Sequence, residues 1–138
     1  MISPAQYAAF NFPEDLRLME YARSIGARFM MHQDSAANPH LEQYAKLDHL
    51  HALDLGQDTD FERLARLMPN AAVNCILFPA WIASHPMDET GEELRRLMRV
   101  GKAFPAFSFT CLEVDTQTGG DLLFQFHETF RRCVAERS

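Results

Sequence analysis

The chain has 138 residues, 47% of them hydrophobic, which is enough for one compact domain over 1–138 with an apolar core. Its 13 basic and 19 acidic residues give a net charge of −6, which opposes binding to nucleic-acid phosphates. No apolar run approaches the roughly 20 residues that cross a bilayer, no signal peptide is evident, and the three cysteines are widely spaced, so we expect a cytoplasmic protein with no membrane contact and no disulfide framework.

Segments of helical periodicity alternate with four short apolar runs along the chain. Ser3 and Pro4 are typical of a helix start, and a second helical stretch begins at Pro13 and stops before Gly26. In chain order we expect helices over 4–10 and 13–25, a strand over 27–31, a helix over 39–47, a strand over 50–53, a helix over 61–68, a strand over 71–78, a helix over 88–100, a strand over 106–110 and a helix over 121–133.

This alternation predicts an α/β fold built from βα units with a parallel sheet. Four such units equal half of an eight-stranded (β/α)8 TIM-like barrel. A half-barrel leaves two edge strands unpaired, and unpaired edges favour association. We therefore expect the chain to form a homodimer or to bind a complementary half.

Polar side chains follow the first two predicted strands where each strand ends. His32 and Asp34 come after the first strand, and Asp54 comes after the second. The two-residue spacing places His32 and Asp34 on one side of an extended chain, so they are candidates to bind a metal ion together. A solvent-facing pair is the alternative. Asp54 is a candidate to orient a ligand histidine or to contact substrate, and capping the turn around Gly56 is its alternative role.

The last predicted strand ends at Cys111, and Glu113 lies two positions further on. Zinc would deprotonate Cys111, whereas a buried free cysteine stays an inert thiol. Glu113 is a candidate fourth metal ligand, or a candidate hydrogen-bond acceptor for one of the ligands. An exposed loop carboxylate is its alternative role. The remaining candidates are expected to be structural: Asp58 and Asp60 as helix caps, Cys75 and Cys133 as core thiols, and His40, His49 and His51 as surface or packing residues.

Several of these segments together resemble one known superfamily. They are Ile2-Ser3-Pro4, Pro13, His32, Ala52-Leu53-Asp54-Leu55-Gly56 with Thr59-Asp60, and Cys111. In this combination the chain resembles the C-terminal half of the uroporphyrinogen decarboxylase superfamily, over nearly its whole length and about half of a family domain. The resemblance implies a (β/α)8 barrel and a small-molecule substrate.

Within that superfamily the cobalamin-dependent methyltransferase branch is the more similar. Its members hold zinc with a His-x-Cys pair and a later cysteine, and the matching positions here are His32, Asp34 and Cys111. Asp34 departs from the pattern, since a carboxylate leaves more positive charge on zinc than a thiolate does. The resemblance implies zinc-dependent methyl transfer between a corrinoid carried by a partner protein and a thiol such as coenzyme M. The arginines and aspartate of the decarboxylases belong mainly to the half that is absent here.

Three interpretations stay open at this point. The chain is a methyltransferase-type metal enzyme, paired with a second copy or with a complementary N-terminal half; or a non-catalytic binding or assembly module; or an incomplete half of a longer enzyme. The first interpretation depends on the imidazole of His32, the carboxylate of Asp34 and the sulfur of Cys111 meeting at a common centre.

Overall fold

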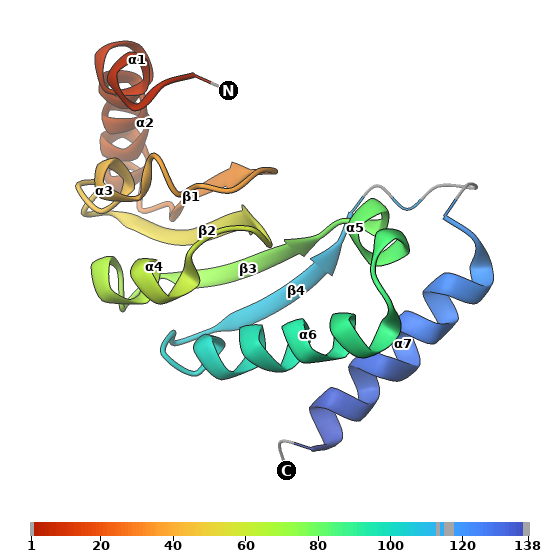
Figure 1. The fold of residues 1–138 in the computed structure, drawn as a ribbon. Coiled ribbons are helices and arrows are strands. Elements are labelled where there is room, and N and C mark those ends of the chain that lie inside the picture. The colour runs from red at the N-terminus through yellow and green to blue at the C-terminus, as the bar shows by residue number, and fades with distance from the viewer. Residues whose placement is uncertain (1, 113, 115–117, 137–138) are drawn as a thin grey trace.

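The computed structural model describes residues 2–112, 114 and 118–136, and it has an α/β architecture (Figure 1). The strands are β1 (Phe29–Gln33), β2 (Leu50–Gly56), β3 (Ala72–Leu77) and β4 (Phe107–Cys111). The helices are α1 (Pro4–Gln6), η1 (Tyr7–Asn11), α2 (Phe12–Ser24), α3 (Leu41–Tyr44), α4 (Phe61–Leu67), α5 (Pro79–Ser84), α6 (Met87–Gly101) and α7 (Gly120–Ala135). None of the described helices combines the length and apolar composition that crossing a bilayer requires.

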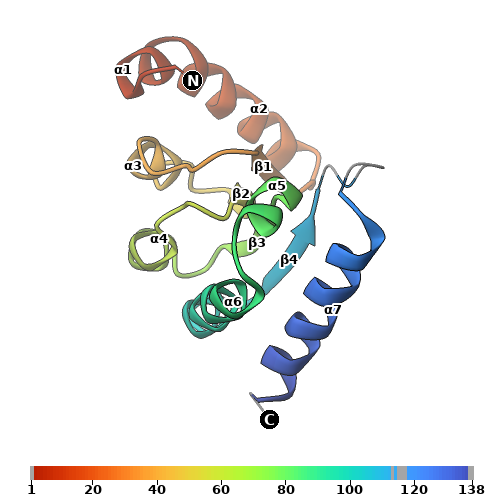
Figure 2. The same ribbon diagram turned by 45° about the vertical axis from the view of Figure 1, so that its right-hand side comes forward.

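The strands form a single four-stranded sheet in the order β1-β2-β3-β4, with every described pair parallel. Helices connect successive strands and lie along the outside of the sheet in an arc, from α2 at one end to α7 at the other (Figure 2). The predicted α/β class with a parallel sheet is confirmed. The arrangement is consistent with half of a TIM-like barrel.

The helix-covered face of the sheet carries the main core. Alternate residues of β2 and β3 point to this face and are buried: Leu53, Leu55, Val73, Cys75 and Leu77. They pack with apolar side chains of the helices that follow, including Phe61, Leu64, Leu94 and Leu97. Each fully buried leucine contributes about 1.5–3 kcal/mol relative to an exposed one. This packing fixes which strand residues remain for the opposite, concave face.

Two predicted helix starts are confirmed by their capping contacts. The Ser3 hydroxyl accepts a hydrogen bond from the Gln6 backbone N–H at 3.2 Å, and the Gln6 side chain accepts one from the Ser3 N–H at 2.9 Å. The Asp60 carboxylate accepts a hydrogen bond from the Arg63 N–H at 2.8 Å and caps α4.

The N-terminal helices differ from the prediction of two separate segments. They form one uninterrupted run through α1, η1 and α2, although Pro13 lies inside it. The π-helical turn η1 carries a wider hydrogen bond, from the Phe12 N–H to the Tyr7 carbonyl, just before the proline. Because proline lacks an N–H and its ring crowds the preceding turn, the wider turn lets the helix continue.

Two further elements also differ from the prediction. The helix expected over 39–47 is only α3, Leu41–Tyr44, with turns on both sides. The short helix α5 was not expected, and it begins with Pro79 at its first position, where a missing N–H is harmless. Short helices carry little periodic signal, so tertiary packing decides their extent.

Candidate functional site

A row of polar side chains crosses the whole sheet at one level. The pairing register places His32 of β1 beside Asp54 of β2, Asp54 beside Asn74 of β3, and Asn74 beside Ser108 of β4. Since neighbours at one level of a sheet face the same way, all four side chains project from one face. Leu53 and Leu55 flank Asp54 and point into the helix-covered core, so the polar row lies on the concave face.

His32 is held at both ring nitrogens by carboxylates. Its Nδ1 lies 2.6 Å from Asp54 Oδ2, and its Nε2 lies 2.6 Å from Asp34 Oδ1. The pKa of His32 is raised, first by the hydrogen bond to Asp54 and then by Asp34, because both carboxylates favour the imidazolium. The Asp54 side chain is 19% exposed and that of Asp34 is 63% exposed, so Asp54 is the fixed partner.

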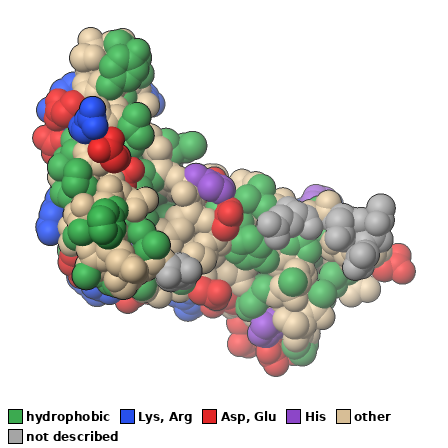
Figure 3. All heavy atoms as spheres, turned by 90° about the horizontal axis from the view of Figure 1, so that it is seen from above, with side chains coloured by type: hydrophobic (Ala, Val, Ile, Leu, Met, Phe, Trp, Pro, Cys, Tyr) green, Lys and Arg blue, Asp and Glu red, His purple; other side chains and the backbone are tan. Residues whose placement is uncertain are grey.

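The view from above shows how the charged groups are distributed. A histidine side chain lies against acidic ones near the middle of the molecule, with hydrophobic side chains to both sides (Figure 3). The His32 side chain is 47% exposed. A solute therefore has direct access to the imidazole.

Asn74 orients Asp54 from the neighbouring strand. Its Nδ2 donates a hydrogen bond to Asp54 Oδ1 at 2.5 Å, and its Oδ1 accepts hydrogen bonds from Ser108 Oγ at 2.8 Å and Thr110 Oγ1 at 3.0 Å. These two hydroxyls determine which end of the amide faces Asp54. Sequence reasoning missed Asn74, Ser108 and Thr110, although polar residues at alternate positions of apolar strands were the signal for them.

A close backbone approach brings Asp34 over the end of β2. A Cβ atom at Gly56 would lie 2.5 Å from the Asp34 carbonyl oxygen and 2.9 Å from the Ser35 carbonyl carbon. Only glycine leaves room for the loop in this path. The Gln33 amide also holds the loop, donating hydrogen bonds to Ser35 Oγ at 3.3 Å and to the Ala36 carbonyl at 3.1 Å.

Cys111 belongs to the other face of the sheet. Its side chain lies on the same face of β4 as Phe107 and Phe109, whose rings pack against the helix-side core, and it pairs with buried Leu77. Burial raises the pKa of the Cys111 thiol and favours its neutral form.

The structure brings His32, Asp34 and Asp54 together but does not bring Cys111 to them. Within residues 2–112, 114 and 118–136, no three histidine, cysteine, aspartate or glutamate side chains are grouped so that they fit a metal ion. Glu113 lies outside the described residues. The three-ligand zinc set expected from the sequence is therefore not assembled in the described part of the chain.

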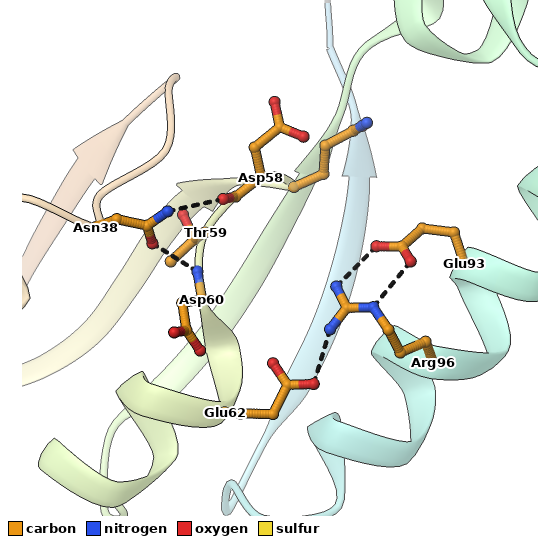
Figure 4. Close-up of a pocket in the computed structure, with 8 residues that line it drawn as sticks. Asn38, Asp58, Thr59, Asp60, Glu62, Glu93 and Arg96 are labelled. Atoms are coloured by element: carbon orange, nitrogen blue, oxygen red, sulfur yellow. Dashed lines mark hydrogen bonds and ion pairs between the residues drawn. The ribbon is translucent and has the colours of Figure 1, made fainter.

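A separate pocket of about 300 Å³ lies at the carboxyl end of β2, toward α4 and α6 (Figure 4). Asn38 fixes its rim, since its Nδ2 donates to the Asp58 carbonyl at 3.1 Å and its Oδ1 accepts from the Asp60 N–H at 2.6 Å. The guanidinium of Arg96 is paired with Glu93 and Glu62 at 2.8 Å each, which raises the pKa of Arg96. The side chains of the polar row are not part of its lining.

No protein-family model and no curated protein matches this chain. The geometry of the described residues is therefore what supports a function.

Proposed function

We propose that the chain is a catalytic half-barrel in which His32 exchanges a proton with a small polar substrate on the concave face of the sheet. One observation carries this proposal, namely the clamping of His32 Nδ1 by Asp54 at 2.6 Å while Nε2 points to the exposed Asp34. An imidazole held at Nδ1 by a carboxylate keeps one tautomer and one ring orientation, which leaves Nε2 for acid–base chemistry.

The charges around the ring favour proton donation. Two carboxylates raise the pKa of His32 above its usual value, so a larger fraction is imidazolium near neutral pH. Asn74 donates to Asp54, which holds that carboxylate turned toward His32 Nδ1. Asp34 lies on a loop and is exposed, so its carboxylate gives way when a substrate group approaches Nε2.

The substrate class follows from what Nε2 does. A proton reaches or leaves a hydroxyl, thiol or carboxyl group, and the thiol acceptors of the methyltransferases that this chain resembles are of that kind. We therefore propose an acid–base step in group transfer involving a small thiol, within the uroporphyrinogen decarboxylase superfamily. Membership of that superfamily stays a prediction.

Zinc-dependent methyl transfer with a corrinoid partner is the second candidate. It is favoured by the Asp54–His32 contact, because histidines that bind metals commonly donate their other N–H to a carboxylate. The ligand set does not fit as expected, however, since Cys111 pairs with Leu77 on the helix-covered face. Metal analysis of protein purified without chelator tests this candidate.

The open concave face supports completion by another half-barrel. Large apolar side chains on the elements that flank the two sheet edges are 57% to 67% exposed: Leu18 and Tyr21 on α2, Ile25 just after it, Met30 on β1, and Phe124 on α7. Large exposed apolar side chains at both edges of the sheet are consistent with contacts to another half-barrel there.

The number of helices favours a complementary half over a second copy. In the described part of the chain, five helices (α2, α3, α4, α6 and α7) cover four strands, with α2 and α7 at the two ends of the arc (Figure 2). A (β/α)8 ring has one helix for each strand. Two copies of this chain would bring ten helices to the eight helix positions of the ring. A complementary half with four strands and only three helices would complete the ring without excess helices. Light scattering separates the cases: a defined dimer would support the homodimer, and a monomer supports the complementary half.

NMR titration of the histidine side chains tests the acid–base proposal. We expect His32 to carry its proton on Nδ1 when neutral, with a pKa above the usual 6.5 that falls in Asp54→Asn. Asp88→Asn, an exposed aspartate in the first turn of α6, is the matched control and should leave the His32 pKa unchanged. A His32 pKa that is at or below 6.5 and does not change in Asp54→Asn would refute the proposal.

A ligand titration tests the substrate class. Coenzyme M is expected to shift the His32 ring signals more than its S-methyl derivative, because only coenzyme M has a thiolate form that can take the proton from His32 Nε2. Equal responses to the two compounds would remove thiols as the substrate class, while leaving the acid–base geometry to be tested by the pKa measurement.

A further inference from the structure

A buried aromatic cluster joins the N-terminal helices to α3. Tyr7, His40 and Tyr44 are 5%, 3% and 4% exposed. The Tyr7 ring lies 5.0 Å from His40 and 5.6 Å from Tyr44 between ring centroids, edge-on to Tyr44 at 82°. The Tyr7 hydroxyl donates a hydrogen bond to Asp15 of α2 at 2.5 Å. The Tyr44 ring is therefore fixed on one side by a different part of the chain.

The His40 ring packs against the rings of Tyr7 and Tyr44. His40 Nδ1 is buried without a hydrogen-bond partner among the described residues, and burial lowers the pKa of His40. A neutral imidazole is the form that such surroundings tolerate. The backbone adds order, because the Tyr44 N–H donates to the His40 carbonyl at 3.0 Å.

The Tyr44 hydroxyl points out of the cluster toward β1. It donates a hydrogen bond to Gln33 Oε1, and burial raises the pKa of Tyr44 to about 12, so the hydroxyl remains a donor through the physiological range. With Oε1 engaged, Gln33 Nε2 is turned toward the loop, where it donates to Ser35 Oγ and the Ala36 carbonyl. The amide thus connects α3 to the loop that carries Asp34.

Gln33 and His32 are neighbours on opposite faces of β1. Gln33 pairs with Leu55 and faces the helices, whereas His32 pairs with Asp54 and faces the concave side. A direct side-chain effect of Gln33 on His32 is therefore excluded by the strand geometry. Any influence has to pass through the backbone of residues 34–36, which also touches Gly56.

We propose that Tyr44 is a positioning residue for the His32 site, because its hydroxyl, acting through Gln33, holds the loop after β1 in the path that places Asp34 at His32 Nε2. This inference rests on the proposed function of His32. Tyr44 touches no reacting atom in this scheme. Its contribution is to keep the carboxylate of Asp34 in place, and that contribution can be measured as a change in the pKa of His32.

The test is a comparison of His32 titrations by NMR. Tyr44→Phe keeps the ring and removes only the hydroxyl, so the cluster should stay packed. We expect the His32 pKa to fall in Tyr44→Phe, in the same direction as we expect for Asp34→Asn. The variant that combines Tyr44→Phe with Asp34→Asn should show no further fall beyond Asp34→Asn alone. Gln33→Met, which removes all three hydrogen bonds of the amide at similar volume, should have the same effect.

Tyr21→Phe is the matched control, since Tyr21 lies on α2 with its side chain exposed, and it should leave the His32 pKa unchanged. An unchanged His32 pKa in both Tyr44→Phe and Gln33→Met, with a lowered one in Asp34→Asn, would overturn the role of Tyr44 and leave the proposed function intact. If Asp34→Asn and Asp54→Asn also leave it unchanged, the proposed function itself fails.

Discussion

Replacing Gly56 by alanine should displace the loop that carries Asp34. The added Cβ would lie 2.5 Å from the Asp34 carbonyl oxygen, against an ordinary contact of at least 3.4 Å, so one backbone segment has to move by about 0.9 Å. The clash is with backbone, which cannot rotate away as a flexible side chain does. Overpacking of this kind costs about 1–3 kcal/mol.

The same displacement should also change the pKa of His32. Movement of Asp34 away from His32 Nε2 removes one of the two carboxylates that favour the imidazolium, so the His32 pKa should fall in Gly56→Ala. Urea unfolding measures the lost stability, and a histidine NMR titration measures the pKa.

Gly120→Ala is the matched control. No atom lies within 4 Å of a Cβ built at Gly120, and the residue begins α7, where alanine is a better helix former by up to about 1 kcal/mol. We expect this variant to be as stable as the original or slightly more so. If Gly56→Ala is equally stable and leaves the His32 pKa unchanged, the close approach of the loop to β2 is not what positions Asp34.

Three further perturbations probe the row and the core. Asn74→Leu should lower stability by about 1–3 kcal/mol and lower the His32 pKa, because Asp54 is no longer held in the orientation that contacts His32; urea unfolding that shows no loss would count against the Asn74 contact. The lowered folded-state pKa of His40 means that the unfolded chain binds the proton more readily, so this contribution to stability is present above about pH 6.5 and is lost as the pH falls. His40→Phe should therefore reduce the decline of the unfolding free energy between pH 7 and pH 5. An identical decline in the variant would show that groups other than His40 cause it. Cys111→Ser should leave the His32 pKa and any bound zinc unchanged, and elemental analysis showing that zinc is lost would contradict the placement of Cys111 on the other face.

The strands and longer helices were predictable because their signals are local. The apolar run that became β3 and the acidic start and late arginines of α6 report on backbone conformation within a few residues. The placement of His32 and Asp34 on one side was predictable for the same reason, since two-residue spacing along an extended chain sets it; their direct contact was not predicted. The limits of α3 were not, because that segment is short and bounded by turns.

Cys111 shows where sequence reasoning stopped short. The alternation of Phe107 and Phe109 with Ser108 and Thr110 already indicated that odd-numbered residues of β4 face the core. A reactive residue at a strand end reaches the site, however, only if its side chain lies on the concave face. The pairing of Cys111 with Leu77 determines the face, and pairing is a property of two strands rather than one.

The sequence by itself determined the succession of helices and strands, the parallel α/β class and the presence of reactive residues at the strand ends, since each of these follows from short-range periodicity and turn chemistry. Tertiary structure alone decided that Asp54 and Asn74, 20 residues apart, are bonded to each other, and that Gly56 admits the backbone of Asp34. The physical reason is that strand register and loop path are set by the packing of the whole sheet against its helices, a long-range free energy that no local pattern records.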